Sequence, residues 1–525
     1  MAQAFAERLR AALPGVALSP RTESGLMPAM VLAVSAADWA ALGAAAHALG
    51  ARWAACWVDP EPDHWRAWVL YEQGGAYVLA QTLLDPRAPR LPSLAAVFAA
   101  ADRPERAIRD LLGVDFEGHP DARRWLRHQA WRAQEHPLRP EQPLAGAPPA
   151  RAPADTGYPF RRIAGDAVHE VAVGPIHAGT IEPGHFRFAA VGEQALTLET
   201  RLGYTHRGVE KLAVGRDAEG LLRLAARVAG DSTVAHAWAA CMAMERAAGC
   251  AVPARALALR ALLAERERVA NHLGDVGGIA NDVGFSFAQM QFGALRERWQ
   301  RRSAVLFGHR LLMDALCAGG VRTDLDLAGT QALLQDHARL RAELAPLVDI
   351  LLDHPSLEDR LVGAGVLSTA DARELGCLGY LGRASGLAFD LRRDAPYPPY
   401  DRLPVRVPLY DSGDVAARMR VRLDEIDVAL ELMDTLLAAL PPGPVSTHWE
   451  APPAGARGLG LVEGWRGETL AFVRFGADGR VARYAPRDPG VFAWPALERL
   501  LPGNIIPDFP VCNKSVNGSY AGGDL

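Results

Sequence analysis

The sequence predicts an α+β protein in which a small N-terminal α/β-sandwich-like domain precedes a larger, mainly helical domain with flanking β-sheets. Three observations predict it. Short apolar runs and helical stretches alternate in the first 135 residues. Several later segments of about 25 residues or more repeat apolar positions at i, i+3, i+4 and i+7. Residues 136–156 hold six prolines and show no apolar period, which is typical of a linker. We therefore expect domains at 1–135 and 157–525.

The expected elements follow from these patterns in chain order. In the N-terminal part, apolar runs predict strands at 27–35, 65–73 and 76–84. Helical spacing predicts helices at 37–49 and 93–113. In the second part, strands are expected at 168–176, 185–193, 195–203, 458–465, 468–476 and 480–486. The long helices are expected at 218–249, 253–282, 286–317, 327–353 and 414–440, and they are typical of a bundle with broad buried faces.

The composition is that of an ordinary globular protein, with 50% apolar residues, 22% charged residues and a formal net charge of −5. This charge gives no electrostatic reason to expect nucleic acid or anionic lipid as a bulk partner. Six cysteines are scattered without a C-x-x-C pair, so we expect no iron–sulfur or zinc site in the chain itself. Neither a signal peptide nor an apolar span of ~18 residues is recognisable, which predicts a cytoplasmic protein and leaves a peripheral role on a membrane complex open.

Three polar stretches are candidates for a functional site. Residues 174–188 place two histidines, a glutamate and an arginine in an expected β-hairpin, for which the alternative is a solvated surface hairpin. Residues 227–237 place Asp231 and His236 in an apolar helix, where a buried charge needs a partner. A lone histidine in a helix is, however, more often a satisfied core residue. Arg466 lies between small residues at a strand start and is expected to project into a cleft.

These stretches carry a resemblance to a known family. In chain order, the motifs GPIHAGTIEPGHFRF, RLGYTHRGVEKL, RVAGDSTVAHA, GRASG and EGWRGE resemble the large subunit of membrane-bound nickel–iron hydrogenases and, equally, the 49-kDa subunit of respiratory complex I, the NADH-quinone oxidoreductase. The earlier stretch PERAIRDLLGVDFEGHPDARRWL resembles the 30-kDa subunit of the same complex, with Ala107 where an acidic residue is usual. A fusion in this order resembles the large subunits of formate hydrogenlyase and hydrogenase-4. The resemblance implies a 30-kDa-like domain at 1–135 and a hydrogenase-like domain at 157–525.

The resemblance also identifies the positions of a metal centre. Where the hydrogenases carry two C-x-x-C pairs, this sequence has Ala229 and Ser232 in the first pair and Ser519 and Gly522 in the second. Thiolate is the soft ligand that selects such a metal, whereas alanine and glycine have no donor atom and a neutral serine hydroxyl is a poor one. We therefore expect no nickel–iron centre and no hydrogen activation. Glu210 matches the magnesium-ligand glutamate of the family and is a possible magnesium site.

The complex I side of the resemblance implies a quinone site. His185 and Asp282 match the histidine and the aspartate that the 49-kDa subunit uses for quinone. The tyrosine of that site falls at Gly230, which has no hydroxyl to donate. Tyr520 could supply a phenol from the C-terminal segment, and we expect it to line the cavity together with Gly230 and Asp231. His185 and Asp282 thus favour a quinone-like cavity, whereas Gly230 argues against it.

Two functions stay open. In the first, an iron–sulfur cluster in a partner subunit reduces a quinone or quinone-like acceptor on this chain, coupled to ion pumping. His185 and Asp282 would then be the proton-donating pair, and Arg466 would stabilise negative charge. Glu182, at the proton-relay position of the hydrogenases, would connect to the membrane arm. In the second, these groups form a buried ion-pair network, and the chain is a non-catalytic scaffold that docks the iron–sulfur subunit onto membrane subunits.

The partners are implied by the same resemblance. They are a small iron–sulfur subunit like the 20-kDa subunit of complex I, a ferredoxin-like subunit, antiporter-like membrane proteins, and a membrane protein like the H component of complex I. The chain would lie peripherally on the inner face of the cell membrane. Family naming associates such subunits with NADH, but we expect no nicotinamide, flavin or nucleic-acid site on this chain.

Overall fold

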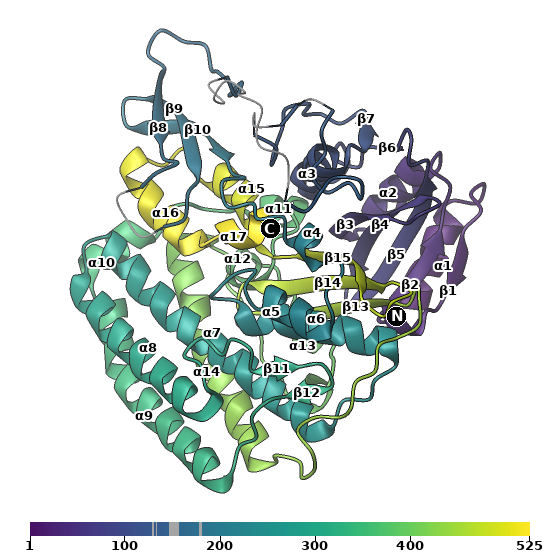
Figure 1. Ribbon diagram of the computed structural model, residues 1–525. Helices are drawn as coiled ribbons and strands as arrows, with labels where there is room; N and C mark the ends of the chain where they lie inside the picture. Colours follow the sequence, from purple (N-terminus) through teal and green to yellow (C-terminus); the bar gives the residue numbers. More distant parts are fainter. Residues whose placement is uncertain (129–130, 133, 146–156, 178–180) are drawn as a thin grey trace.

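The structure is a computed structural model that describes residues 1–128, 131–132, 134–145, 157–177 and 181–525. Figure 1 shows a sheet-rich N-terminal part on one side, a bundle of long helices on the other, a small sheet between them, and the C-terminal helices above the bundle. This mixed architecture confirms the predicted α+β class. Within the described ranges, no helix combines the length and the apolar character that crossing a membrane requires.

The N-terminal part is built on a five-stranded sheet of order β1-β2-β5-β4-β3, in which β2 and β5 run parallel and the other neighbours antiparallel. Strand β3 was not predicted, because its apolar residues directly continue those of the preceding helix. The elements are α1 (Ala2–Ala12), β1 (Ser19–Arg21), β2 (Ala29–Ala33), α2 (Trp39–Ala48), β3 (Arg52–Pro60), β4 (Trp65–Gln73), β5 (Ala76–Leu84), β6 (Arg90–Pro92), α3 (Asp102–Leu112) and β7 (Asp115–Glu117).

The second part begins with an antiparallel three-stranded sheet, continues through the helices and ends with another antiparallel sheet and three helices. Its first half contains β8 (His169–Val173), β9 (His185–Val191), β10 (Gln194–Arg201), α4 (Val209–Ala213), α5 (Ala218–Ala225), α6 (Thr233–Ala248), α7 (Ala254–Asp282), α8 (Ser286–Phe307), β11 (Leu316–Cys317), β12 (Gly320–Val321) and α9 (Leu327–Leu352). Its second half contains α10 (Pro355–Leu361), α11 (Thr369–Glu374), α12 (Gly379–Ala384), α13 (Leu391–Asp394), α14 (Val415–Ala438), β13 (Arg457–Gly464), β14 (Gly467–Phe475), β15 (Val481–Arg487), α15 (Gly490–Leu500), α16 (Phe509–Val516) and α17 (Tyr520–Asp524).

The long helices form the bundle that the apolar spacing predicted. Helices α7, α9 and α14 lie within two residues of their expected ends. Helix α7 packs against both α8 and α14. Helix α14 starts where the Asp414 carboxylate accepts a hydrogen bond from the backbone N–H of Ala417, as a helix N-cap does. Helix α8 is shorter than expected, because Gly308 ends it in a left-handed conformation (φ 83°).

The predicted single helix at 218–249 is wrong. The chain forms α5 and α6, and an irregular segment at 226–232 separates them. Distant side chains satisfy the backbone groups at this break: Arg207 donates to the carbonyl oxygens of Arg227 and Val228, and the Glu267 carboxylate accepts from the first turn of α6. Asp231 therefore lies in the break rather than in a helix, whereas His236 lies in α6.

Helix α6 lies directly on strand β13, and two glycines allow this close packing. A Cβ atom on Gly458 would lie 1.7 Å from the carbonyl oxygen of Ala243, and one on Gly460 would lie 1.9 Å from that of Ala239. Any larger residue at either position would collide with the helix backbone. Helix α6 and strand β13, which each have one end at the candidate site described below, are thus held at a fixed separation.

The N-terminal sheet and the second part share a buried polar interface. The Asp59 carboxylate accepts two hydrogen bonds from Arg474, at 2.6 and 2.8 Å. Arg52 forms an ion pair with Glu468 at 2.9 Å, and the Tyr77 hydroxyl donates to the same carboxylate. The domain boundaries at 1–135 and 157–525 remain a prediction. The later half of the expected linker, 146–156, lies outside the described residues.

Candidate functional site

The C-terminal segment lies against the loop that joins β8 and β9. The backbone N–H of Ala521 donates to Oε2 of Glu182 at 3.1 Å. Gly184 packs so closely on Tyr520 that an added Cβ would lie 2.5 Å from its ring. The expected hairpin at 174–188 is in fact this loop, flanked by antiparallel strands that begin earlier and end later; residues 178–180 lie outside the described chain. Two segments more than 300 residues apart therefore form one surface.

Arg466 joins the start of α6 to the C-terminal segment from the turn between β13 and β14. Its guanidinium makes two hydrogen bonds to the Asp231 carboxylate, at 2.8 and 2.6 Å, and one to Oγ of Ser232 at 3.1 Å. It also donates to the carbonyl oxygen of Asn517 at 2.8 Å. The guanidinium lies over the ring of Trp465, 4.0 Å from its centroid. Arg466, which was expected to project into a cleft, thus lies in a network of polar contacts between these segments.

A second link between the two segments runs through Asp488. Its Oδ2 accepts a hydrogen bond from Nε2 of His236, at 2.8 Å, and both side chains are buried. A Cβ added to Gly522 would lie 2.5 Å from the Asp488 carboxyl carbon, so this carboxylate fills the space beside the glycine. Ser519 is adjacent, because its Oγ accepts from the backbone N–H of Gly522 at 2.9 Å. The segments that carry the four positions matched to ligand cysteines by the resemblance therefore converge on Arg466 and Asp488.

The donors at these four positions do not fit a nickel–iron centre. Ala229 and Gly522 have no donor atom. The Ser232 hydroxyl already receives hydrogen bonds from Arg466 and from Nε1 of Trp465, each at 3.1 Å, and Ser519 caps a helix turn. Nickel and iron in such centres need soft, anionic sulfur ligands. In the described part of the chain, no three His, Cys, Asp or Glu side chains are grouped to hold a metal ion.

Glu210 also fits a magnesium ion poorly. Its Oε2 lies 2.8 Å from a guanidinium nitrogen of Arg483. Magnesium requires about six oxygen ligands in near-octahedral geometry, and a guanidinium beside the carboxylate repels a second cation. The ion pair with Arg483 thus occupies the carboxylate that a magnesium ion would need.

Both carboxylates at the centre of the site stay ionised. Burial alone would raise the pKa of Asp231, but the charge of Arg466 outweighs it and holds the pKa below its ordinary value. Burial would likewise raise the pKa of Asp488, but the hydrogen bond and charge of His236 lower it. The site thus holds two negative charges, each with a cationic or hydrogen-bonding partner.

His185 and Asp282 are not in direct contact. Nδ1 of His185 is hydrogen-bonded to the carbonyl oxygen of Gly174 at 3.0 Å, and burial lowers the pKa of its ring. Asp282 ends α7, where burial raises its pKa and Lys514 opposes the rise. Among the described residues, no hydrogen bond or ion pair joins the two side chains. His185 instead borders a groove of about 600 Å³, together with Tyr158.

The predicted cavity-lining residues divide between two places. Gly230 and Asp231 line a small cavity of about 20 Å³ near α7. Tyr520 packs against Trp494, with ring centroids 4.5 Å apart, and burial raises the pKa of its phenol to about 12. The phenol therefore keeps its proton at neutral pH. Glu182 is exposed and contacts the C-terminal segment at Ala521.

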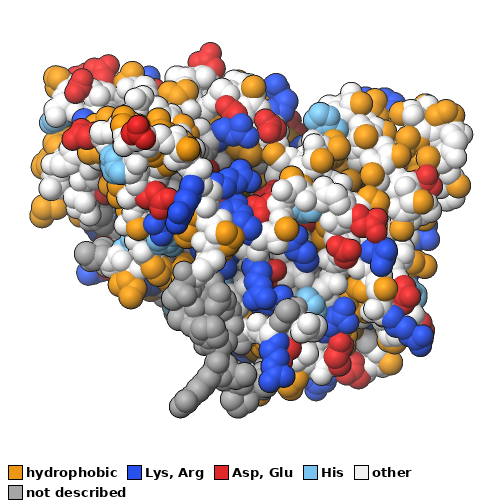
Figure 2. All heavy atoms as spheres, turned by 90° about the horizontal axis from the view of Figure 1, so that it is seen from above, with side chains coloured by type: hydrophobic (Ala, Val, Ile, Leu, Met, Phe, Trp, Pro, Cys, Tyr) orange, Lys and Arg blue, Asp and Glu red, His pale blue; other side chains and the backbone are white. Residues whose placement is uncertain are grey.

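A larger groove, of about 750 Å³, opens between α3 and the β8–β10 sheet. Seven arginines line it, and each has a carboxylate within 4 Å; Arg103, for example, pairs with Glu498 at 2.7 Å. Figure 2 shows acidic and basic side chains intermixed on this side of the molecule. Because its charges are paired internally, the groove does not indicate an anionic ligand.

Several residues of the site were not predicted. Asp488 gave no signal, since it follows β15 in an ordinary turn sequence. Glu267 and Asn271 lie on α7, where they look like solvated helix residues, yet Glu267 caps α6 and Asn271 binds the carbonyl oxygen of Asp231 at 2.7 Å. Trp465 stands next to Arg466 in the motif EGWRGE, and its position there was the one available signal.

Comparisons with known proteins identify the family of this chain. Family models match the respiratory-chain NADH dehydrogenase 30-kDa subunit at residues 31–148, the nickel-dependent hydrogenases at 207–274, and the respiratory-chain NADH dehydrogenase 49-kDa subunit at 282–454. The chain is 34% identical over 450 residues to formate hydrogenlyase subunit 5 of Escherichia coli (strain K12), covering 85% of this chain and 79% of the relative. It is 32% identical over 462 residues to hydrogenase-4 component G of the same strain, covering 87% and 80%.

A solved structure is similar as well. A chain of the membrane-bound sulfane sulfur reductase, an archaeal respiratory membrane complex, superposes with a TM-score of 0.65 at 27% identity, covering 68% of this chain and 99% of the other. The resemblance seen in the motifs is therefore confirmed at the level of sequence and fold. The chain belongs to the family of hydrogenase and respiratory NADH dehydrogenase large subunits, in the form that joins a 30-kDa-like part to a 49-kDa-like part.

Proposed function

We propose that this chain is a peripheral subunit of a membrane-associated respiratory oxidoreductase complex, and that it works without a nickel–iron centre. Two of its relatives are a formate hydrogenlyase subunit and a hydrogenase-4 component, and the structural neighbour is part of a respiratory membrane complex. The donor chemistry at Ala229, Ser232, Ser519 and Gly522 supports the second half of the proposal.

The reaction we assign to the chain is the reduction of a quinone or quinone-like acceptor. A quinone takes up two electrons and two protons to become a quinol. The electrons come from an iron–sulfur cluster in a small partner subunit, and ion pumping takes place in membrane subunits. The single observation that carries this proposal is that the C-terminal segment contacts both the β8–β9 loop, at Glu182, and Arg466, which also binds the start of α6.

The residues around the His185 groove suit an acceptor with a planar ring. Tyr158 and Phe160 lie in its wall, and Nε2 of His185 has no hydrogen-bond partner among the described residues. Burial lowers the pKa of this ring, and the Nδ1–H group already donates to the carbonyl oxygen of Gly174. In the neutral ring Nε2 is therefore an acceptor, which suits the hydroxyl group of a quinol. Asp282, whose pKa is raised by burial, does not line this groove, so its proton would have to reach the acceptor through a relay.

The partners in this proposal are a 20-kDa-like iron–sulfur subunit, a ferredoxin-like subunit, antiporter-like membrane proteins, and a membrane protein like the H component of complex I. The chain would lie on the inner face of the cell membrane. Glu182, exposed beside the C-terminal segment, would exchange protons with the neighbouring subunits.

A second candidate function is a non-catalytic scaffold that docks the iron–sulfur subunit onto the membrane subunits. One observation favours it. The polar groups beside the four positions matched to ligand cysteines satisfy one another, as Arg466 with Asp231 and His236 with Asp488. A site filled by its own ion pairs resists opening, since separating buried pairs leaves unpaired charge.

Electron transfer in the purified complex separates the two functions. Iron–sulfur clusters are first reduced, and menadione or a ubiquinone analogue is then added while the electron paramagnetic resonance of the clusters is followed. We expect fast reoxidation that His185→Ala slows and that the control His169→Ala, an exposed histidine on β8, leaves unchanged. Clusters that stay reduced would leave the scaffold as the function. Stoichiometric nickel in the same preparation would contradict the missing metal centre.

A further inference from the structure

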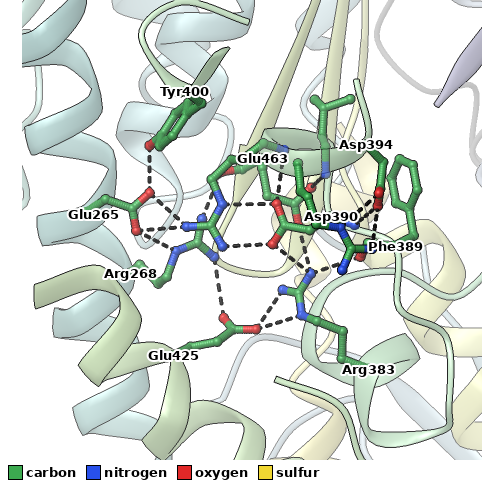
Figure 3. Close-up of polar contacts among 12 residues, drawn as sticks. Glu265, Arg268, Arg383, Phe389, Asp390, Asp394, Tyr400, Glu425 and Glu463 are labelled. Carbon is green, nitrogen blue, oxygen red and sulfur yellow. Dashed lines mark hydrogen bonds and ion pairs between the residues drawn. The ribbon is translucent and has the colours of Figure 1, made fainter. Parts of the chain in front are cut away.

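A cluster of buried charges lies in the core of the second part, around the end of strand β13 (Figure 3). Helices α7, α12 and α14, the α13 region and strand β13 each contribute at least one member. We call it the Glu463 cluster, and its ionic members are the carboxylates Glu265, Asp390, Glu425 and Glu463 and the guanidinium groups of Arg268, Arg383 and Arg392.

The charges of this cluster do not balance if every group is ionised. Four carboxylates face three guanidinium groups, and each of the seven side chains is at most 1% exposed. An unpaired charge so far from water is costly, and a buried acid usually avoids it by keeping its proton. One proton therefore has to be held within the cluster.

His272 does not supply the missing positive charge. Its Nε2 donates to Oε2 of Glu425 at 2.7 Å, while its buried Nδ1 has no partner among the described residues. Protonating the ring would bury an N–H group without an acceptor. Burial also lowers the pKa of this histidine, although Glu425 opposes that effect.

Two of the carboxylates are strongly paired. Glu265 accepts from Arg392 at 2.9 and 3.0 Å, from Arg268 at 3.0 Å and from the Tyr400 hydroxyl at 2.6 Å. Both oxygens of Asp390 accept from Arg392, at 3.0 and 2.7 Å. Bidentate pairs of this kind stabilise the ionised acid.

Glu425 is also strongly paired. It accepts from Arg383 at 2.7 Å and from His272 at 2.7 Å. Burial would raise its pKa, but these two partners lower it well below its ordinary value. Glu425 therefore carries a charge, like Glu265 and Asp390.

Glu463 is the exception. It accepts from the backbone N–H of Leu391 at 3.1 Å and from one nitrogen of Arg383 at 3.2 Å. That nitrogen also contacts the carbonyl oxygen of Phe389 and a carboxylate oxygen of Asp390. Glu463 thus shares a single guanidinium nitrogen with two other acceptors, and it is the least stabilised anion of the four.

We propose that Glu463 holds the proton that neutralises this cluster, and that it is a proton-binding site inside the second part of the chain. Burial raises the pKa of Glu463 to about 7, Asp390 adds to the rise, and Arg383, Arg392 and Arg268 oppose it. Across the β13–β14 pair, the facing Glu468 is neutralised separately by ion pairs to Arg52 and Arg487. The group exchanges its proton near neutral pH.

This site is connected to the Arg466 turn. Glu463 precedes Arg466 by three residues on the same strand and turn, and Arg268 donates to the carbonyl oxygens of Glu463 and Gly464 at 3.0 and 3.1 Å. Loss of the proton places a new negative charge beside Arg383 and changes the balance of the whole cluster. If the proposed quinone reduction is correct, Glu463 is a proton reservoir for it, but the proton site itself does not depend on that function.

Infrared difference spectroscopy on the purified full-length chain tests the proposal without any acceptor or partner. A protonated carboxyl group has a carbonyl band that an ionised one lacks. We expect the spectrum of the unmodified chain minus that of Glu463→Gln to contain the band of one buried carboxylic acid at pH 6, and to lose it as the pH rises past about 7. The spectrum of the unmodified chain minus that of the control Glu7→Gln, a change at an exposed residue, should contain no such band. A difference spectrum without the band overturns the proposal.

A second variant tests the charge count even if Glu463→Gln does not fold. Glu265→Gln removes one negative charge, so three carboxylates then face three guanidinium groups, and Glu463 no longer needs its proton. We expect the buried-acid band to disappear from the folded Glu265→Gln chain at pH 6. A band that persists there at full intensity contradicts the charge-balance argument and assigns the proton to another group.

Discussion

Replacing Arg466 with lysine should release the C-terminal segment from the start of α6. The guanidinium makes four hydrogen bonds, to Asp231, Ser232 and the carbonyl oxygen of Asn517. A lysine ammonium group keeps the charge but is a single point, so it cannot reach the carboxylate and the carbonyl oxygen together. At least two of the four bonds are lost.

The size of the effect follows from these bonds. Each hydrogen bond to a charged group contributes roughly 1.5–3 kcal/mol. The Asp231 side chain is 37% exposed, so solvent screens part of its interaction. We expect Arg466→Lys to lower the free energy of unfolding by about 2–4 kcal/mol.

Urea unfolding measures this loss, and amide hydrogen exchange locates it. Residues 517–525 should exchange faster in Arg466→Lys. In the control Asp231→Asn, which keeps the bond to Asn517, they should remain better protected. A loss below about 1 kcal/mol with unchanged exchange at the C-terminus would refute the idea that this arginine holds the segment in place.

Three further predictions concern the stability of the fold. Folding raises the pKa of Glu463 from 4.5 to about 7, so its stabilising contribution is complete below pH 4.5 and is lost as the pH rises to about 7. Over that interval, the free energy of unfolding measured in urea should therefore fall by about 3 kcal/mol more for the unmodified chain than for Glu463→Gln. Unfolding free energies of the two chains that run parallel with pH would contradict this. Asp59→Asn should cost about 3–5 kcal/mol, because it leaves the Arg474 guanidinium buried without its anion; a thermal melt unchanged from that of the unmodified chain would show that this interface is unimportant. Gly460→Ala should lower the yield of folded protein sharply, since its methyl group would meet the backbone of α6 at 1.9 Å, and normal expression with an intact circular-dichroism melt would count against that close contact.

The sequence predicted the long helices because their own residues determine them. Helices α7, α9 and α14 repeat apolar positions over more than 20 residues, so the pattern is strong and their ends are nearly right. The break between α5 and α6 could not be predicted. Side chains that lie far away in the sequence, such as Arg207 and Glu267, satisfy its backbone groups.

The residues of the candidate site were likewise predictable only in part. Arg466 could be identified because it lies in a compact motif whose resemblance is specific. Asp488 could not, since its importance depends on contact with His236, 252 residues earlier. The pairing of His185 with Asp282 was inferred from family positions, and geometry rather than residue type decides whether such a pair meets.

The glycine contact between β13 and α6 has an evolutionary consequence. Gly458 and Gly460 bring main chain against main chain, so the spacing of these two elements does not depend on the side chains at their far ends. Ser232 and Arg466 occupy those ends. Substitutions there can exchange one chemistry for another while the framework keeps its dimensions.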